Sequence, residues 1–92
     1  MNRACGLDVH KDTIFCGVYN GKAHGAIKEY STLTCSIRSM GEHLLTEGVE
    51  EIAMESTGMY WIPVWNILEE MGFKLMLVAD YIKKLQHPFL PE

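Results

Sequence analysis

Two acidic residues stand out because each follows an apolar, strand-like run and could supply a carboxylate to a shared site. Asp8 lies in the segment GLDVHKD, and Glu55 lies in the segment AMESTG. Carboxylate oxygens are the hard ligands that Mg²⁺ and Mn²⁺ prefer. Phosphodiester cleavage commonly depends on such ions, which activate the nucleophile and stabilise the leaving oxygen. If the fold brings Asp8 and Glu55 together, we expect the pair to act as catalytic metal ligands beside a phosphate.

The first acid sits on a predicted strand over residues 4–10, where side chains alternate between two faces. One face is apolar, with Cys5, Leu7 and Val9. The other face carries small residues around Asp8, which leaves space beside its carboxylate for a substrate or an ion. The alternative is that Asp8 only ends a surface strand.

Four further strands and two helices complete the predicted order β-β-β-α-β-α-β. Strands are expected over 13–19, 24–31, 49–56 and 73–79, with a hairpin at Asn20-Gly21. The last strand is nearly all apolar, as expected for burial on both faces. A further helix could begin over 80–86, before the prolines of the C-terminal segment.

The two main helices have recognisable starts, stops and apolar stripes. Thr32 or Thr34 is expected to cap the first helix, and Gly41 inside it marks a close approach to the sheet or has no special role. Gly48 and Gly72 are the expected stops. The apolar positions of the first helix are Ile37, Met40, Leu44 and Leu45, and those of the second are Tyr60, Val64, Ile67, Leu68 and Met71.

The order of elements predicts one domain over 1–92, with a mixed five-stranded sheet in the order 3-2-1-4-5 and packed helices. Helices that link parallel strands make right-handed crossovers. Strands one and four are then neighbours, so Asp8 and Glu55 lie at the carboxyl ends of adjacent parallel strands. Open α/β sheets place their functional sites there.

Several polar residues near these acids are weaker candidates. His10, Lys11 and Thr57 could contact phosphate or DNA; His10 could also support Asp8, and Thr57 could simply cap a helix. Asp12 and Asp80 are more readily explained as caps than as ligands. Trp61 and Trp65 could stack on bases or form a patch for another protein segment.

Composition limits the classes of function. The formal charge of −4 argues against a free-standing electrostatic DNA-binding protein. There is no apolar run long enough for a membrane span. The three cysteines form no CxxC pair and are expected to be buried thiols, which suits a cytoplasmic protein. The methionines are expected to fill the core rather than to bind metal.

The predicted strand order is that of the ribonuclease H-like fold, and the two acidic segments resemble a known family. GLDVHKD and MESTGMYW look like the N-terminal RuvC-like domain of insertion-sequence transposases of the Piv/MooV DNA-invertase type, which carry a DEDD set of acids. The resemblance runs from about residue 4 to Asp80. It makes Asp8 the first acid of the set and Glu55 the second.

The resemblance implies metal-dependent phosphodiester chemistry in DNA transposition and recombination. It also implies DNA as substrate, a homo-oligomer, and a guide RNA from the mobile element. The other two acids of the family fall beyond this chain, and residues 81–92 do not resemble the family. We therefore expect a truncated domain that binds Mg²⁺ poorly and is inactive alone.

Two alternatives come from other classes of protein. The actin and sugar-kinase type of nucleotide-binding fold starts with the same order of elements, but it would place a glycine-rich phosphate loop after the first acid, and VHKD has no glycine. A non-catalytic oligomerisation module would retain its assembly after Asp8→Ala.

Overall fold

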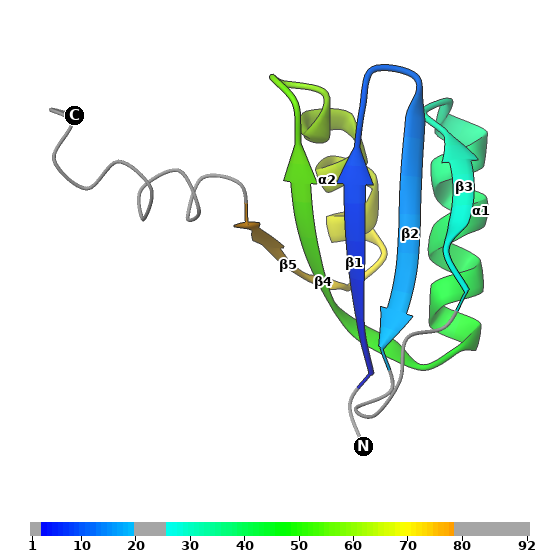
Figure 1. Ribbon diagram of the computed structural model, residues 1–92. Helices are drawn as coiled ribbons and strands as arrows, with labels where there is room; N and C mark the ends of the chain where they lie inside the picture. Colours follow the sequence, from blue (N-terminus) through cyan, green and yellow to red (C-terminus); the bar gives the residue numbers. More distant parts are fainter. Residues whose placement is uncertain (1–2, 20–25, 79–92) are drawn as a thin grey trace, which may run out of the picture.

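The computed structural model describes residues 3–19 and 26–78, which form one mixed β-sheet and two helices (Figure 1). The strands are β1 (Arg3–Val9), β2 (Thr13–Tyr19), β3 (Lys28–Ser31), β4 (Val49–Ser56) and β5 (Lys74–Leu77). Their order in the sheet is β3-β2-β1-β4-β5, which confirms the predicted ribonuclease H-like topology.

Strands β1, β2 and β3 form an antiparallel meander at one side of the sheet. β1 pairs with β2 from Ala4 opposite Tyr19 to Val9 opposite Ile14. β3 is shorter than the predicted strand over 24–31, and the Asn20-Gly21 hairpin lies outside the described residues. A main-chain hydrogen bond from His10 N to the Thr13 carbonyl, 2.8 Å long, closes the turn between β1 and β2.

Helix α1 (Thr34–Thr46) leads from β3 to β4 and packs with Ile37, Met40 and Leu44 buried. Leu45 is exposed, because it falls outside the stripe that the other three residues define. Leu33 occupies the N-cap position without a side-chain hydrogen bond, so the prediction of a threonine cap was wrong. The Thr32 hydroxyl instead donates to the Lys11 carbonyl. Gly48 ends the segment with φ of +81°, as predicted.

Helix α2 (Trp61–Glu70) leads from β4 to β5 and buries Val64 and Leu68. Tyr60 was predicted to belong to the buried stripe, but it is the exposed N-cap residue. The rings of Trp61 and Trp65 meet edge to face, with centroids 5.6 Å apart, and pack partly buried against the core. Gly72, with φ of +98°, ends the helix as predicted.

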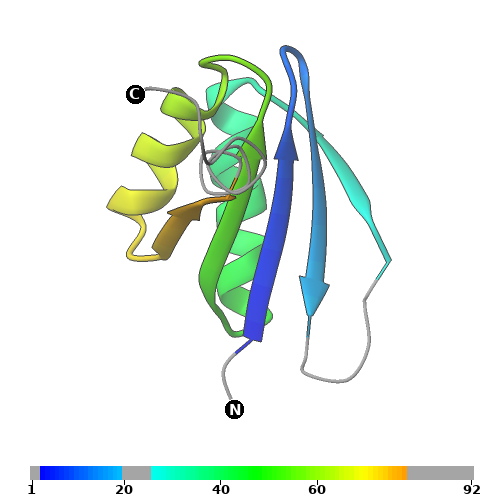
Figure 2. The same ribbon diagram turned by 60° about the vertical axis from the view of Figure 1, so that its left-hand side comes forward.

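Both helices cover the same face of the sheet, as the two views in Figures 1 and 2 show. The helices meet at Gly41, where an added Cβ would lie 2.5 Å from the Met71 sulfur and 3.2 Å from Leu68 Cδ2. The close approach predicted for Gly41 is therefore toward α2 and not toward the sheet. No helix in the part of the chain that the structure describes is long and apolar enough to cross a membrane.

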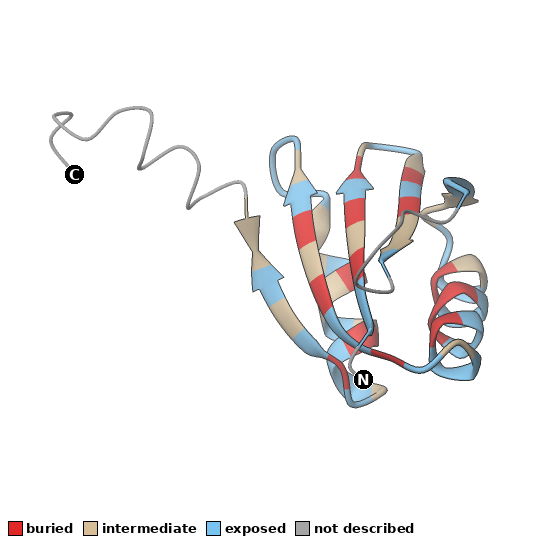
Figure 3. Ribbon diagram, turned by 60° about the horizontal axis from the view of Figure 1, so that its bottom comes forward, coloured by how far each residue is buried: buried red, intermediate tan, exposed pale blue. Residues whose placement is uncertain are grey.

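The core lies between the helices and the covered face of the sheet, so burial alternates along the strands (Figure 3). Its strand residues are Cys5, Leu7, Val9, Ile14, Cys16, Val49, Ile52 and Met54.

Three predictions of burial were wrong, although Cys5 and Cys16 are buried as expected. Cys35 lies on an exposed position of α1. Met59 and Met76 are 69% and 62% exposed, so they do not fill the core as Met40 and Met54 do. Both helices cover the same face of the sheet, so the other face of β5 is open instead of both being buried.

Candidate functional site

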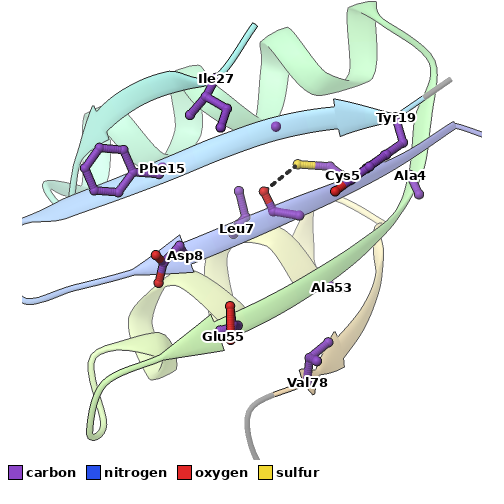
Figure 4. A pocket seen from close by; sticks show the side chains of 12 residues that line it. Ala4, Cys5, Leu7, Asp8, Phe15, Tyr19, Ile27, Ala53, Glu55 and Val78 are labelled. Carbon is purple, nitrogen blue, oxygen red and sulfur yellow. Dashed lines mark hydrogen bonds between the residues drawn. The ribbon is translucent and has the colours of Figure 1, made fainter. Parts of the chain in front are cut away.

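The carboxyl ends of β1 and β4 bring the two predicted acids to neighbouring positions. The strands pair in parallel, with Asp8 opposite Glu55 and Leu7 opposite Met54. Leu7 and Met54 face the helices, so the alternation of side chains places both acids on the other, open face. Figure 4 shows the two carboxylates side by side at the end of the sheet. The sequence-based prediction that the fold brings Asp8 and Glu55 together is confirmed.

His10 is the third polar side chain at this end of the sheet. Its Nε2 atom lies 3.2 Å from Asp8 Oδ2, and the side chains of His10 and Asp8 are 43% and 51% exposed. The imidazole also meets the ring of Phe15 edge to face, with centroids 5.9 Å apart. Phe15 is the β2 residue opposite Asp8. Two contacts thus orient His10 toward Asp8, as expected for a residue that supports this acid.

The acids stand at one end of a hollow of about 730 Å³ on the open face. Its floor is made of small residues, namely Ala4, Gly6, Gly17 and Ala53. Phe15, Tyr19 and Ile27 line one side, and Val78 lines the other (Figure 4). The hollow is therefore largely apolar, with its charge concentrated at Asp8 and Glu55.

The other candidate residues lie in the turns beside the acids. Thr57 is exposed in the turn after β4, and its main-chain N–H donates to the Val9 carbonyl over 3.2 Å. This bond ties the ends of β4 and β1 together. Thr57 was a possible helix cap, but Tyr60 holds that position. Lys11 and Asp12 are exposed in the turn between β1 and β2.

The donor set at this site suits a partly hydrated Mg²⁺ better than a fully enclosed ion. Asp8 and Glu55 supply carboxylate oxygens from adjacent strands. No cluster of three histidine, cysteine, aspartate or glutamate side chains within residues 3–19 and 26–78 could hold a metal. Mg²⁺ in phosphate-handling sites usually keeps several waters and takes one or two carboxylates, the rest of its shell coming from substrate phosphates. The pair fits that role.

Two features of the structure were not predicted from the sequence. The apolar side of the hollow was not predicted, although alternation along β2 places Phe15, Gly17 and Tyr19 on the face of Asp8. The contact between the buried thiols of Cys5 and Cys16 was also missed, because it depends on how β1 and β2 pair.

Comparisons with known proteins support the fold but identify no family. No protein-family model matches the chain, and no curated protein matches it. The solved structures that it resembles include a ROK hexokinase from Thermus thermophilus, with a TM-score of 0.57 and 23% identity. That match covers 82% of this chain and 32% of the hexokinase chain.

Two structures from Aquifex aeolicus are also similar. The type II variant of the Ppx/GppA phosphatase matches with a TM-score of 0.50 and 11% identity, over 84% of this chain and 35% of the phosphatase chain. A second structure of the PPX-GPPA enzyme matches with a TM-score of 0.50 and 10% identity, over 83% and 35% of the two chains. This chain thus spans about a third of the length of the structures that it matches.

These matches correct the prediction of an insertion-sequence transposase domain. They are to a hexokinase and to phosphatases, which have the actin-like ATPase fold, so the assignments to DNA transposition and recombination were wrong. The physical reason is that the strand order 3-2-1-4-5 is shared by ribonuclease H-like and actin-like half-domains. Two acids at the ends of parallel strands suit either fold.

Other sequence-based predictions are not tested by these findings. DNA, a guide RNA and further copies of the chain as partners stay predictions, as does the alternative of a non-catalytic oligomerisation module. The prediction of a truncated single domain likewise stays a prediction. The chain does resemble parts of enzymes, because the matched structures are a hexokinase and phosphatases.

Proposed function

We propose that this chain is the nucleotide-binding half-domain of an actin-like kinase or phosphatase, in which Asp8 and Glu55 hold the Mg²⁺ that accompanies the phosphates. The observation that carries the proposal is the parallel pairing of Asp8 with Glu55 on the open face. The likeness to a hexokinase and to a phosphatase supports phosphoryl chemistry, with a sugar hydroxyl or water as the acceptor.

Charge explains why a cation belongs in this site. Asp8 and Glu55 place two negative charges beside each other, and a polyphosphate adds more. Without a cation between them, the carboxylates repel the phosphates. Mg²⁺, when bound, would neutralise the charge that develops on the transferred phosphoryl group.

The remaining polar residues would position the acids and the phosphates. His10 holds the Asp8 carboxylate through the Nε2 to Oδ2 contact of 3.2 Å. Lys11 sits in the adjacent exposed turn, where its ammonium group can reach a phosphate through solvent. The main-chain N–H of Thr57 is already used by Val9, so the hydroxyl of Thr57 is the group left for a ligand.

The turn between β1 and β2 departs from the glycine-rich phosphate loop expected of this class. Its residues His10, Lys11 and Asp12 have ordinary backbone conformations, since every residue with positive φ among those described is a glycine elsewhere. A close approach of main-chain amides to phosphate usually requires glycine. We therefore assign phosphate contact in this turn to the side chains of His10 and Lys11.

Calorimetric titration with ATP, in the presence and absence of Mg²⁺, tests the proposal. Because the chain spans about a third of the matched enzymes, we expect weak binding that requires Mg²⁺. Asp8→Asn and Glu55→Gln should each weaken the binding of Mg·ATP at least about tenfold, or roughly 1.4 kcal/mol.

Glu51→Gln is the matched control, because Glu51 precedes Glu55 on β4 and is also exposed to solvent. It lines a different hollow, with Lys74 and Met76, and is not a lining residue of the hollow that holds Asp8. The control should bind Mg·ATP like the unmodified chain. Equal binding by all variants, or equal binding without Mg²⁺, would refute the proposal.

A further inference from the structure

Two cysteines on adjacent strands lie in contact inside the core. Cys5 of β1 and Cys16 of β2 are 2% and 4% exposed, and their sulfur atoms are 3.4 Å apart. The strand register sets Cys5 opposite Val18 and Leu7 opposite Cys16, so the cysteines are diagonal neighbours on the covered face. Core packing alone needs no such pair, because an apolar side chain would fill either position.

Cys16 has a route to solvent that does not pass through the Asp8 site. A small hollow of about 90 Å³ reaches Cys16 between β3 and α1, and Lys28, His43 and Glu47 are among its lining residues. Lys28 Nζ lies 2.9 Å from His43 Nε2, and the same histidine nitrogen lies 3.1 Å from Glu47 Oε2, so charges of both signs stand at the mouth of the hollow. A hollow of this size suits a very small oxidant such as hydrogen peroxide.

The two thiols are electronically different. The hydrogen bond between the two sulfurs lowers the pKa of Cys16, and the nearby Lys28 ammonium acts in the same direction, whereas burial and Glu47 act against this shift. The same hydrogen bond raises the pKa of Cys5, and burial raises it further. The thiolate is the nucleophilic form of cysteine, so Cys16 is the more reactive sulfur of the two.

We propose that Cys5 and Cys16 form a redox pair that hydrogen peroxide converts into an intramolecular disulfide. The Cys16 thiolate attacks one peroxide oxygen and breaks the O–O bond, which gives a sulfenic acid and hydroxide. The Cys5 sulfur then attacks the Cys16 sulfur, displaces the second hydroxide and gives up its proton. The two thiols lose two electrons, and one peroxide becomes two waters.

The diagonal arrangement makes this disulfide reversible. Diagonal Cα atoms on neighbouring strands are about 7–8 Å apart, whereas a relaxed disulfide joins Cα atoms about 4.4–6.8 Å apart. Bond formation must therefore draw β1 and β2 together, and the strained bond is readily reduced by a dithiol. The modification does not depend on the proposed nucleotide site, because it is defined by the two sulfurs alone.

Peptide mapping of the folded chain after brief treatment with hydrogen peroxide tests the proposal. Trypsin places the three cysteines in separate peptides, with Cys5 in 4–11, Cys16 in 12–22 and Cys35 in 29–38. We expect a disulfide that links 4–11 to 12–22 and disappears with dithiothreitol. In Cys35→Ser, the number of free thiols should fall from two to none without dimer formation.

The order of the two steps is tested with single-cysteine variants. Cys5→Ser should accumulate a sulfenic acid on Cys16, which dimedone traps, and Cys16→Ser should leave Cys5 reduced. Because either change could unfold the chain, the linked peptide from Cys35→Ser is the deciding measurement. Absence of that peptide, or oxidation of Cys16 to sulfinic acid without a link, would overturn the proposal.

Discussion

The two faces of the sheet differ in almost every physical property, although the same strands build both. The covered face packs Leu7, Ile52 and Met54 beneath α1 and α2 with almost no exposure to solvent. The open face carries Asp8 and Glu55 at one end of an apolar hollow. One face supplies the stability of the fold and the other presents its chemistry.

The difference shows how a small domain separates stability from function. Helical crossovers of one hand place both helices on one side of the sheet. The open side is then free to hold charges that a core would not tolerate, because an unpaired buried carboxylate costs several kcal/mol. Within the described residues, no polar or charged side chain is buried.

The largest expected difference in the free energy of unfolding is between substitutions of two methionines, one on each face of the sheet. Met54 is fully buried and Met76 is 62% exposed. Met54→Ala should lower the free energy of unfolding by about 2–5 kcal/mol, because it removes buried methylene groups and leaves a cavity. Met76→Ala, the matched control, should change it by no more than about 0.5 kcal/mol. Urea unfolding followed by tryptophan fluorescence measures the free energy of unfolding of both variants. Equal losses of stability would contradict the predicted difference between the two faces.

A smaller effect is expected from the two acids on the open face. Like charges at opposed positions of neighbouring strands destabilise a sheet. Without divalent cations, Glu55→Gln should therefore raise the free energy of unfolding by a few tenths of a kcal/mol, since solvent screens exposed charges. Added Mg²⁺ should remove or reverse this gain.

Thermal unfolding at low ionic strength, with Glu51→Gln as the control, measures the effect of the acid pair. Glu51 lacks an acidic neighbour at its paired positions, Ala4 and Lys74. Its substitution should not raise stability. A loss of stability in Glu55→Gln without metal would show that the carboxylate has a favourable partner instead.

The smallest expected effect on stability comes from Tyr30, which lies at the margin of the covered face. Burial raises the pKa of Tyr30 above its ordinary value of 10.0, and the nearby Cys16 and Glu47 act in the same direction. As the pH rises, the phenol ionises at a lower pH in the unfolded chain than in the folded chain. The contribution of Tyr30 to the free energy of unfolding is therefore fully present below about pH 10 and is lost between the unfolded and folded pKa values. Tyr30→Phe should show a shallower alkaline loss in urea titrations. Identical slopes would contradict the raised pKa of the partly buried phenol.

Local patterns predicted much of the fold. Alternation and β-branched residues gave the bounds of β2 and β4 as the structure has them, and Gly48 and Gly72 marked the ends of the helical segments. Predictions failed where burial depends on neighbours. β5 is as apolar as a buried strand, but Met76 is exposed because it lies on the face of the sheet that the helices do not cover. Tyr60 has helical spacing, but α2 starts one residue later.

The candidate site was partly predictable for the same reason. Asp8 and Glu55 could be chosen because each ends an apolar strand, which is a local property. The His10 contact with Asp8 and the apolar side of the hollow required the turn and the pairing of β1 with β2. The motifs did not distinguish the two classes of protein, since ribonuclease H-like and actin-like half-domains share this strand order.

The amino-acid sequence by itself determined which side chains share a face of each strand, because alternation along an extended backbone is a matter of covalent geometry. It thereby placed Asp8 and Leu7 on opposite faces of one strand, and Glu55 and Met54 on opposite faces of another. Only the tertiary structure decided that β1 lies beside β4 with Asp8 opposite Glu55. This pairing arises because the crossover through α1 carries the chain from β3 past β2 and β1, and because both helices bury their apolar stripes on a single face of the sheet.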